Sequence, residues 1–492
     1  MQWRHTRFHR HSRHNRRLEH KDCNMMRFQF QNLGLLDEAE VALADLTLIC
    51  GENNTGKTYA TYAIYGFMRS WRQLLGHVLR PDIEAVLQQQ SQFQIDLQQM
   101  FAGKVNDYLQ RMGAAYVQRL PRVFATQNHV FEGAQWLPVS DLDDDLVARS
   151  YQQRIQAGPN GKVLATITKE PGHAVLEILV TDAQVVQGAF GGLTDFVIDA
   201  IAEVVFAPHL PRVHIASAER TGAAIFRKEL DMARTRMLKT INEMDSKELK
   251  RNPLKILQSM EADYPWPVED NVEFVRRLED IDKRTSPLVE AHPELLQAFD
   301  GIIGGSYKVV KEQLVFQAKG AAKQRFTMNE ASSCIRALLD VGFYLRCVAK
   351  PGDLFMIDEP ELNLHPKNQR AFARLVAQLV NAGVKVFITT HSDYLVKELN
   401  TLIMLNQRSA HTRQVQEQYG YVDAELLAPE KVRLYMTDTA LRAAPDGGRR
   451  SRFKTLTPAD SSPDRGIEVA TFDDTIEVMN AIQSEILFGE PL

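Results

Sequence analysis

The sequence has few cysteines and no long hydrophobic run. Its 492 residues include four cysteines, Cys23, Cys50, Cys334 and Cys347, and no two of them form a CxxC pair. This pattern argues against a disulfide framework or a zinc knuckle and favours a reducing cytoplasm. The sequence also lacks any stretch of ~18 apolar residues, so we expect no membrane-spanning helix.

Positive charge is concentrated at the N-terminus, and the rest of the chain is acidic. The whole sequence has 58 Lys and Arg against 62 Asp and Glu, whereas residues 1–25 hold six arginines and one lysine against two acids. A basic arm of this kind is typical of a nucleic-acid-binding tail. The simpler interpretation is a disordered extension or a start codon placed too early, because Met25 and Met26 directly precede the first strand pattern. The acidic body argues against a wide DNA-binding face but leaves room for a local contact.

The composition is that of a globular protein with two to four structural units, because 44% of the residues are hydrophobic and 24% are charged. Apolar residues recur at helical spacing after Thr58, over 82–120 and over 224–300, so we expect helices there. Strand patterns are expected at 28–33, 41–49, 163–167 and 175–180, the last two joined as a hairpin.

Residues 307–400 show the clearest alternation of strands and helices. A strand pair is expected around 307–317, a helix through residue 349, and two short apolar strands at 354–357 and 384–388 with a helix between them. Such alternation predicts a mostly parallel α/β sheet. Residues 401–492 have a mixed pattern, in which the Pro-, Gly-, Arg- and Ser-rich stretch 444–466 is expected to be an exposed loop.

A phosphate-binding loop follows the strand expected at 41–49. The segment from Gly51 to Thr58 matches GxxxxGK[ST], and an expected helix begins behind it. Its glycines let backbone N–H groups surround phosphate oxygens, and the helix N-terminus adds its dipole. Lys57 is expected to reach the β- and γ-phosphates, and the Thr58 hydroxyl to ligate Mg²⁺. The predicted nucleotide-binding residues of this loop are Gly51, Asn53, Asn54, Thr55, Gly56, Lys57 and Thr58.

Chemistry-bearing side chains end two of the later strands. Asp358 and Glu359 end the strand at 354–357. Most such pairs are solvated turn residues, but beside a phosphate loop Asp358 is suited to hold Mg²⁺ and Glu359 to polarise the attacking water. His391 ends the next strand, where a neutral imidazole could hydrogen-bond the γ-phosphate, although a lone histidine is usually structural. The sequence therefore predicts a magnesium-dependent ATPase, with Glu359 and His391 as catalytic residues.

Taken together, these segments resemble the AAA-type ABC ATPases, relatives of the RecF and SMC heads and of the ATPase half of OLD-family nucleases. The resemblance rests on four motifs in order, GENNTGKT (51–58), ASS (331–333), IDEPELNLHP (357–366) and TTHS (389–392). It implies an α/β ABC-ATPase head with a mostly parallel P-loop sheet, an antiparallel β lobe, and a helical and β insertion between Walker A and the signature. ATP and Mg²⁺ are the implied ligands.

The resemblance also implies residue roles around Walker B. Asp358 would be the Mg²⁺-side acid, Glu359 the catalytic base, and His391 the switch histidine. Asn363 and His365 would lie in the D-loop, between the two active sites of a head-to-tail dimer.

Ser332 and Ser333 correspond to the signature, which in this group contacts the γ-phosphate of ATP bound to the opposite subunit. An ordinary helix N-cap is the alternative for these serines, and both roles can hold. Cys334 replaces the glycine that usually follows them, and its side chain hinders close approach to a phosphate. The segment around Glu219 and Arg220 resembles the group's Pro-Ala-Glu-Arg segment. Either it lies near the site in the manner of a Q-loop, or it forms a buried structural ion pair.

The expected organisation has five parts. They are a basic disordered arm (1–25), the N-terminal part of the ATPase head (26–80), an inserted helical and β region (81–304), the C-terminal part of the head (305–400) and a mixed extension (401–492).

Three functions are compatible with these motifs. Stand-alone ATPases of this group pair with a separately encoded nuclease or toxin, as in PARIS-, Septu- and retron-type antiviral systems. The resemblance therefore implies a cytoplasmic ATP-driven switch, assembled as a homodimer or higher even-numbered homo-oligomer, with an effector protein as partner and a phage-derived trigger. The alternatives are a RecF- or SMC-like DNA-binding repair ATPase and an OLD-type nuclease. The latter lacks support, because the stretch after residue 400 is short for a Toprim domain and has no Asp-x-Asp after an apolar strand.

Overall fold

The computed structural model describes residues 25–89, 93–141, 146–156, 163–180, 192–226, 264–310, 313–321, 324–442, 451–462, 466–467 and 478–484. Most of the expected basic arm, with Cys23, lies outside the described residues, as do residues 227–263 of the region expected to be helical. The strands are β1 (Met26–Leu33), β2 (Leu36–Leu43), β3 (Leu46–Cys50), β4 (Phe93–Asp96), β5 (Gln135–Ser140), β6 (Tyr151–Gln156), β7 (Val163–Lys169), β8 (Val175–Val180), β9 (Val213–Ala216), β10 (Gly305–Val310), β11 (Gln313–Ala318), β12 (Arg325–Thr327), β13 (Leu354–Asp358), β14 (Lys385–Thr390), β15 (Val432–Arg442), β16 (Ser451–Pro458), β17 (Ser461–Ser462) and β18 (Gly466–Ile467).

Helices connect and cover these strands. The α-helices are α1 (Lys57–Gln89), α2 (Leu97–Phe101), α3 (Val105–Val117), α4 (Leu120–Val123), α6 (Gly192–Ile201), α7 (Arg220–Ile225), α11 (Trp266–Arg276), α12 (Leu278–Ile281), α13 (Pro287–Ala291), α14 (Pro293–Ile303), α15 (Ser333–Ala337), α16 (Leu339–Cys347), α17 (Pro366–Asn381), α18 (Asp393–Leu405) and α19 (Ala410–Tyr419). A π-helical turn, η2 (Ala202–Phe206), continues α6, and short 3₁₀ turns are η1 (Asn128–Phe131), η3 (Asp423–Glu425) and η4 (Pro429–Lys431).

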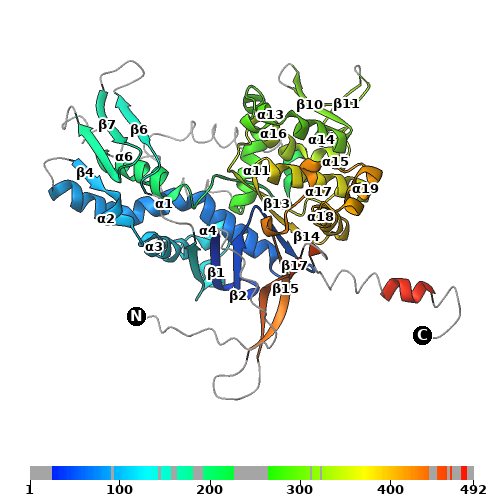
Figure 1. Ribbon diagram of the computed structural model, residues 1–492, viewed down its shortest axis with the longest axis horizontal. Helices are drawn as coiled ribbons and strands as arrows, with labels where there is room; N and C mark the ends of the chain where they lie inside the picture. Colours follow the sequence, from blue (N-terminus) through cyan, green and yellow to red (C-terminus); the bar gives the residue numbers. More distant parts are fainter. Residues whose placement is uncertain are drawn as a thin grey trace, which may run out of the picture.

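A six-stranded sheet of order β16-β15-β3-β14-β13-β9 lies at the centre of the molecule (Figure 1). The strands from β15 to β9 run parallel, and β16 pairs antiparallel with β15. Every residue of β3 and β13 is buried, as expected for strands covered on both faces. The expected mostly parallel α/β sheet is therefore confirmed. Its register places Cys50 beside Thr390 and Asp358 beside Thr389, so the three strands end at one edge.

Three strands of the central sheet, β9, β15 and β16, come from two unexpected parts of the sequence. β9 lies within 81–304, yet it pairs with β13 and forms one edge of the sheet. β15 lies within 401–492, yet it pairs directly with β3, the strand that leads into the phosphate loop. The central sheet is thus assembled from segments spread over most of the described chain.

An antiparallel sheet of order β2-β1-β5 packs beside the start of α1. Its inner face is aromatic. Phe30 and Trp136 stack with ring centroids 5.5 Å apart, and Phe67 of α1 meets Tyr116 edge-on at 5.4 Å. Aromatic side chains bury large areas, and these contacts anchor α1 firmly. The N-terminal turn of α1, where a phosphate would bind, therefore has a rigid support.

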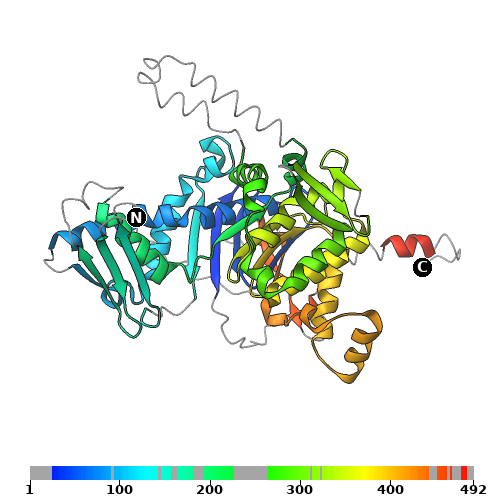
Figure 2. The same cartoon turned by 90° about the horizontal axis from the view of Figure 1, so that it is seen from above.

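A second antiparallel sheet, of order β4-β8-β7-β6, lies at one end of the molecule, away from α14 to α19 (Figures 1 and 2). The pair β7 and β8 confirms the expected hairpin, and its turn has Gly172 at φ 84°. Helix α6 packs against α1 and joins this sheet to the aromatic core.

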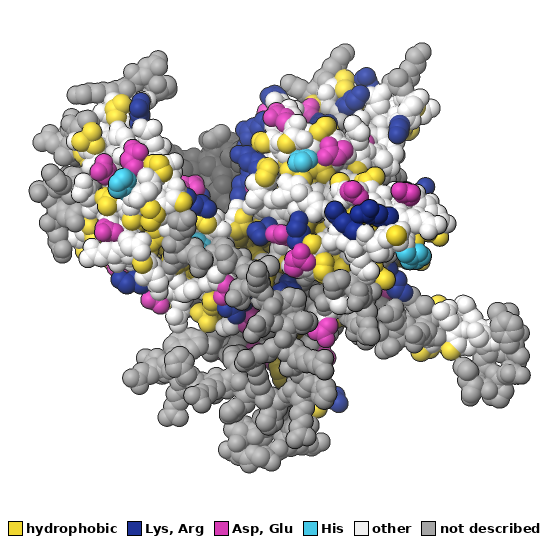
Figure 3. Space-filling view, in the orientation of Figure 1, with side chains coloured by type: hydrophobic (Ala, Val, Ile, Leu, Met, Phe, Trp, Pro, Cys, Tyr) yellow, Lys and Arg dark blue, Asp and Glu magenta, His cyan; other side chains and the backbone are white. Residues whose placement is uncertain are grey.

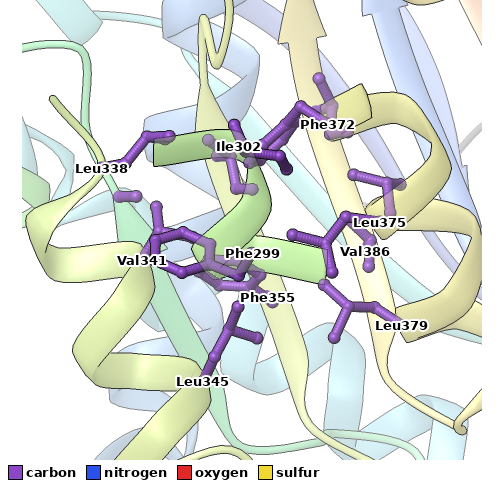
Figure 4. Close-up of a cluster of buried hydrophobic side chains, with 14 of the residues drawn as sticks. Phe299, Ile302, Leu338, Val341, Leu345, Phe355, Phe372, Leu375, Leu379 and Val386 are labelled. Carbon is purple, nitrogen blue, oxygen red and sulfur yellow. The ribbon is translucent and has the colours of Figure 1, made fainter. Parts of the chain in front are cut away.

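Helices α14, α16 and α17 cover one face of β13 and β14. Phe299, Val341 and Leu345 converge on Phe355, while Phe372, Leu375 and Leu379 approach Val386 (Figure 4). All are nearly inaccessible to solvent. Burying a side chain of this size contributes ~1.5–3 kcal/mol, so this layer holds the strand that ends in Asp358 firmly in place.

Three sequence expectations were wrong in detail. The strand expected over 41–49 is two strands, β2 and β3, and β2 begins at Leu36 and so contains Asp37 and Glu38. Region 82–120 is not entirely helical, because β4 intervenes. The loop expected over 444–466 contains β16, in which Leu456 is the sole buried residue, so no apolar alternation could reveal it. Among the described helices, none is long and apolar enough to span a membrane.

Candidate ATP-hydrolysis site

The phosphate loop joins β3 to α1, and its backbone requires glycine at two positions. Gly51 has φ 149°, and a Cβ there would lie 1.8 Å from Oγ1 of Thr437 on β15. Gly56 has φ 103°, and a Cβ there would lie 2.8 Å from Cγ of Leu36 on β2. Asn54 also has a positive φ, which asparagine tolerates better than most residues. The loop therefore has the strand–loop–helix context that phosphate binding requires.

Lys57 begins α1, and its side chain folds back over the loop. Its Nζ donates to the carbonyl oxygens of Gly51 at 2.8 Å and Glu52 at 2.7 Å. The residue is 5% exposed. Both partners are neutral carbonyl groups, so the positive charge of the ammonium group is not neutralised by them and remains available to bind an anion. Thr55 donates its hydroxyl to the Glu52 carbonyl and tightens the same turn. The remaining predicted contacts, Asn53, Asn54 and Thr58, are exposed at the loop surface.

Asp358 ends β13 and is almost completely buried. Burial raises the pKa of its carboxyl to about 6, and the nearby Glu359 and Glu219 carboxylates act in the same direction. A hydrogen bond from the Thr389 hydroxyl and the charge of Arg220 oppose that rise. Burying a carboxylate without a full counter-charge is unfavourable. The arrangement therefore favours a cation beside Asp358.

Glu359 adopts a left-handed backbone, with φ 50°. This conformation costs a non-glycine residue roughly 1–2 kcal/mol, so the surroundings must hold it. Its N–H donates to the Thr389 carbonyl at 3.0 Å and to Thr389 Oγ1 at 3.2 Å. Its carbonyl accepts a hydrogen bond from Arg220 at 2.8 Å. Strained backbone clusters at functional sites, and here it turns the Glu359 side chain out of the strand, where it is 22% exposed.

Arg220 is the central support of this turn. It is 1% exposed, and its guanidinium donates to the carbonyl oxygens of Ser217, Ala337, Asp358 and Glu359 at 2.7–2.9 Å. The ion-pair alternative for this segment does not describe what Arg220 does, because Arg220 is buried but bonds to backbone carbonyls rather than to a carboxylate. The signal that could have revealed it is a lone arginine four residues after the end of an apolar strand.

Tyr62 is a site residue that the sequence analysis missed, and it contacts Glu219 of the segment resembling Pro-Ala-Glu-Arg. Tyr62 lies one helical turn after Thr58, and its hydroxyl donates to Glu219 Oε2 at 2.9 Å. Burial raises the pKa of Tyr62, and the Asp358, Glu219 and Glu359 carboxylates raise it further. The phenol is therefore protonated and lies among three carboxylates. The segment resembling Pro-Ala-Glu-Arg thus lies at the site, as one of the two sequence alternatives required.

His391 follows β14 and lies beside Glu359. Its Nδ1 is 3.6 Å from Glu359 Oε1 and 3.3 Å from Glu361 Oε1, and its side chain is 42% exposed. The structure therefore brings together the ends of β3, β13 and β14, with Lys57, Asp358, Glu359 and His391 at one edge of the sheet.

The signature serines lie on a different element, α15. Ser332 caps this helix, and its Oγ accepts the Ile335 N–H at 3.5 Å, so the N-cap interpretation is confirmed. Both Ser332 and Ser333 are exposed, whereas Cys334 is half-buried. Asn363, with φ 63°, and His365 are also exposed, in the turn before α17.

The residues present fit a magnesium nucleotide. Mg²⁺ prefers oxygen ligands, and it is usually held by one or two carboxylates together with substrate phosphates. The Thr58 hydroxyl on α1 and the Asp358 carboxylate at the end of β13 are such donors. The two elements lie close together, because the Asp358 charge raises the pKa of Tyr62, which is one turn after Thr58 on α1. Within the described ranges, no group of three His, Cys, Asp or Glu side chains could hold a metal ion. A cation would thus bind here together with the phosphates of its nucleotide.

Residues 205–396 match the family model described as the AAA ATPase domain. This segment includes β9, Arg220, Asp358, Glu359 and His391, and it ends before the C-terminal half of α18. No curated protein matches the chain.

Several solved structures are similar to the chain. One is an SMC head bound to the C-winged helix domain of ScpA, with 11% identity, 89% of this chain and 98% of that chain covered, and a TM-score of 0.33. Another is the Smc head domain with an extended coiled coil bound to the C-terminal domain of ScpA, derived from Pyrococcus furiosus, with 13% identity, 94% and 99% coverage, and a TM-score of 0.32. The SMC head domain from Thermotoga maritima has 9% identity, 89% and 100% coverage, and a TM-score of 0.27.

The domain match and the geometry lead to the same enzyme class. The matched segment supplies the acidic strand end and the histidine, and β3 places the phosphate loop beside them. The chain is therefore a P-loop ATPase, an enzyme that binds and hydrolyses ATP.

Proposed function

We propose that the chain is an ATP-driven molecular switch in which two copies share their ATP sites. The location of the signature serines carries this proposal. Ser332 and Ser333 are exposed on α15, and in the described part of the chain no hydrogen bond or ion pair joins them to the phosphate loop. Asn363 and His365 are exposed as well. Such residues can complete the site of a second copy, which is the role that the sequence resemblance implies.

In this proposal each side chain of the site has one task. Lys57 neutralises phosphate charge, and Glu359 orients the attacking water and accepts its proton. Thr58 and Asp358 would hold Mg²⁺, which when bound neutralises charge that develops on the phosphate oxygens. His391 donates a hydrogen bond to the γ-phosphate and loses that contact after hydrolysis. ATP thus closes the pair of heads, and hydrolysis opens it.

We further propose that the switch controls a separately encoded effector, a nuclease or a toxin, in antiviral defence, with a phage-derived molecule as its trigger. The support for this role is the sequence resemblance to stand-alone ATPases that pair with such effectors. A homodimer or a higher even-numbered homo-oligomer satisfies the requirement for shared sites.

Subunit mixing tests the shared site. Lys57→Ala alone and the Ser332→Ala/Ser333→Ala double variant alone should both be inactive. A mixture should recover activity, because a mixed dimer contains one site with an intact lysine and an intact signature. Each variant mixed with itself over the same concentrations is the control. Absence of recovery at every mixing ratio would show that the sites are not shared.

Glu359→Gln tests the switch. The amide keeps the size of the side chain but cannot accept the proton, so hydrolysis should fall by ~10²–10⁴. ATP binding should persist, and the variant should accumulate as a closed oligomer that size-exclusion chromatography with light scattering detects. If hydrolysis is lost but the oligomeric state in ATP is unchanged, the assignment as an ATPase stands and the proposal of an ATP-driven switch is refuted.

A DNA-binding ATPase of the SMC or RecF kind is the second candidate. Arg277, Lys283 and Arg284 are exposed around α11 and α12, although the basic side chains on the face in Figure 3 form small separate groups. ATP-dependent affinity for plain duplex DNA that falls steeply with salt would favour this candidate. Charge reversal of these three residues should then abolish that affinity.

A further inference from the structure

Glu361 is a buried carboxylate close to the ATP site. It lies two residues after Glu359, in the turn between β13 and α17, and its side chain is 5% exposed. Its Oε1 accepts the Thr390 hydroxyl at 2.8 Å and the His391 backbone N–H at 2.8 Å. The same oxygen lies 3.3 Å from His391 Nδ1. One carboxylate oxygen therefore faces the backbone and the imidazole of a single residue.

The other oxygen of Glu361 makes no hydrogen bond to any described residue, although it is buried. A buried carboxylate with an unsatisfied oxygen is costly, and a structural cap of β14 would need only Oε1. The Cys50 thiol lies nearby, and the charge of Glu361 adds to the effect of burial in raising the pKa of that thiol.

The imidazole of His391 lies against this carboxylate. Glu361 and Glu359 both lie on its Nδ1 side, at 3.3 and 3.6 Å. A carboxylate that faces Nδ1 favours the proton on that nitrogen and fixes the ring orientation, as second-shell carboxylates do for other functional histidines. The distance of 3.3 Å is slightly long for an N–H···O bond, so a small rotation of the ring can tighten it. Nε2 then lies on the opposite side of the ring.

We propose that Glu361 is the positioning residue of His391. It holds the imidazole with Nδ1–H toward the carboxylate and Nε2 toward the nucleotide, and when Nε2 donates to the γ-phosphate it carries a proton as well, so that the ring donates from both nitrogens. Because Nδ1 then bonds to Glu361 rather than to Glu359, the Glu359 carboxylate stays available to bind the attacking water. This inference rests on the proposed role of His391 at the γ-phosphate.

A double-mutant cycle measures the connection between the two residues. Glu361→Gln keeps the acceptor oxygen but loses the charge, and kcat should fall about tenfold with ADP affinity unchanged. His391→Ala should lower kcat at least as much. In the His391→Ala background, Glu361→Gln should change kcat less than twofold. Glu398→Gln is the matched control, because Glu398 is equally buried but lies on α18 and pairs with Arg370.

Each other outcome has a distinct meaning. If His391→Ala lowers kcat and Glu361→Gln does not, the inference is overturned and the role of His391 stands. If the two effects multiply, Glu361 acts independently and the inference is overturned. If His391→Ala has no effect, both the role of His391 and the inference fail. Should Glu361→Gln not fold, Glu361→Asp replaces it in the cycle, since it keeps the charge but withdraws it by one methylene.

A spectroscopic readout is independent of hydrolysis. ¹⁵N chemical shifts of histidine-labelled protein report which ring nitrogen carries a proton, and the signal of His391 is the one missing in His391→Ala. The wild-type protein should show a proton on Nδ1, and Glu361→Gln should shift this proton toward Nε2. A wild-type ring without a proton on Nδ1 would overturn the inference.

Discussion

Replacing Arg220 by lysine should lower both the stability of the protein and the rate of ATP hydrolysis, because Arg220 holds the turn that contains Glu359. The guanidinium donates four hydrogen bonds in a planar fork, to carbonyls that belong to three separate segments. A lysine ammonium has three donors on a single atom and cannot span the same four oxygens. At least two carbonyls, including that of Glu359, should lose their partner.

The magnitude follows from these bonds. A hydrogen bond to a charged group contributes ~1.5–3 kcal/mol, so losing two should cost ~3–6 kcal/mol. That is a large part of the ~5–15 kcal/mol that stabilises a typical protein. The left-handed Glu359 backbone adds a second effect, because ~1–2 kcal/mol favours its relaxation once the support is lost. The fraction of molecules in which Glu359 keeps its left-handed, catalytically competent backbone should then fall roughly 5- to 30-fold.

Thermal unfolding followed by circular dichroism and steady-state ATP hydrolysis test this reasoning together. Arg220→Lys should lower the unfolding midpoint, and at temperatures where it is folded its kcat should be about tenfold lower. Arg413→Lys, on the exposed helix α19, is the control and should change neither quantity. If Arg220→Lys melts and hydrolyses ATP like the wild type, the four hydrogen bonds do not support the catalytic turn.

Two further predictions concern the phosphate loop, and a third concerns a buried carboxyl group on α16. Lys57→Ala should abolish ATP hydrolysis, and a variant with wild-type turnover would refute the assignment of the phosphate loop. Gly51→Ala should weaken ATP binding by at least tenfold in a titration with a fluorescent ATP analogue, because its Cβ collides with Thr437 and its φ is unfavourable; unchanged affinity would contradict the steric argument. Burial raises the pKa of Asp340 on α16 to about 6, above its unfolded value of ~3.9, so its contribution to stability is present below pH ~4 and is lost as pH rises through 6. Urea unfolding should show that the wild type loses ~3 kcal/mol relative to Asp340→Asn between pH 4 and pH 7, and a difference independent of pH would be the contrary result.

Local patterns were sufficient to predict the phosphate loop and the strand that ends in Asp358. Both depend on neighbouring residues, namely a short apolar run followed by glycines or carboxylates. The same holds for the β7 and β8 hairpin and for the N-cap role of Ser332.

Features that depend on distant partners could not be predicted in this way. The function of Arg220 arises from carbonyls on segments more than a hundred residues later. The hydrogen bond from Tyr62 to Glu219 likewise joins residues far apart in the sequence. Helix α1 continues through Pro81, where a break is the usual expectation, because its packing against α3 and α6 outweighs the local cost.

The strand order of the central sheet also determines when the ATP site can form during synthesis. β3 lies between β14 and β15, both of which leave the ribosome long after it. At ~5–20 residues per second, β3 waits roughly 20–70 s for β14. During that interval β3 lacks both of its native strand neighbours. A nascent chain interrupted before β14 has a phosphate loop but no His391, and its Asp358 strand can pair with β9 alone. A polypeptide can therefore begin to turn over ATP only after β14 and His391 have been synthesised.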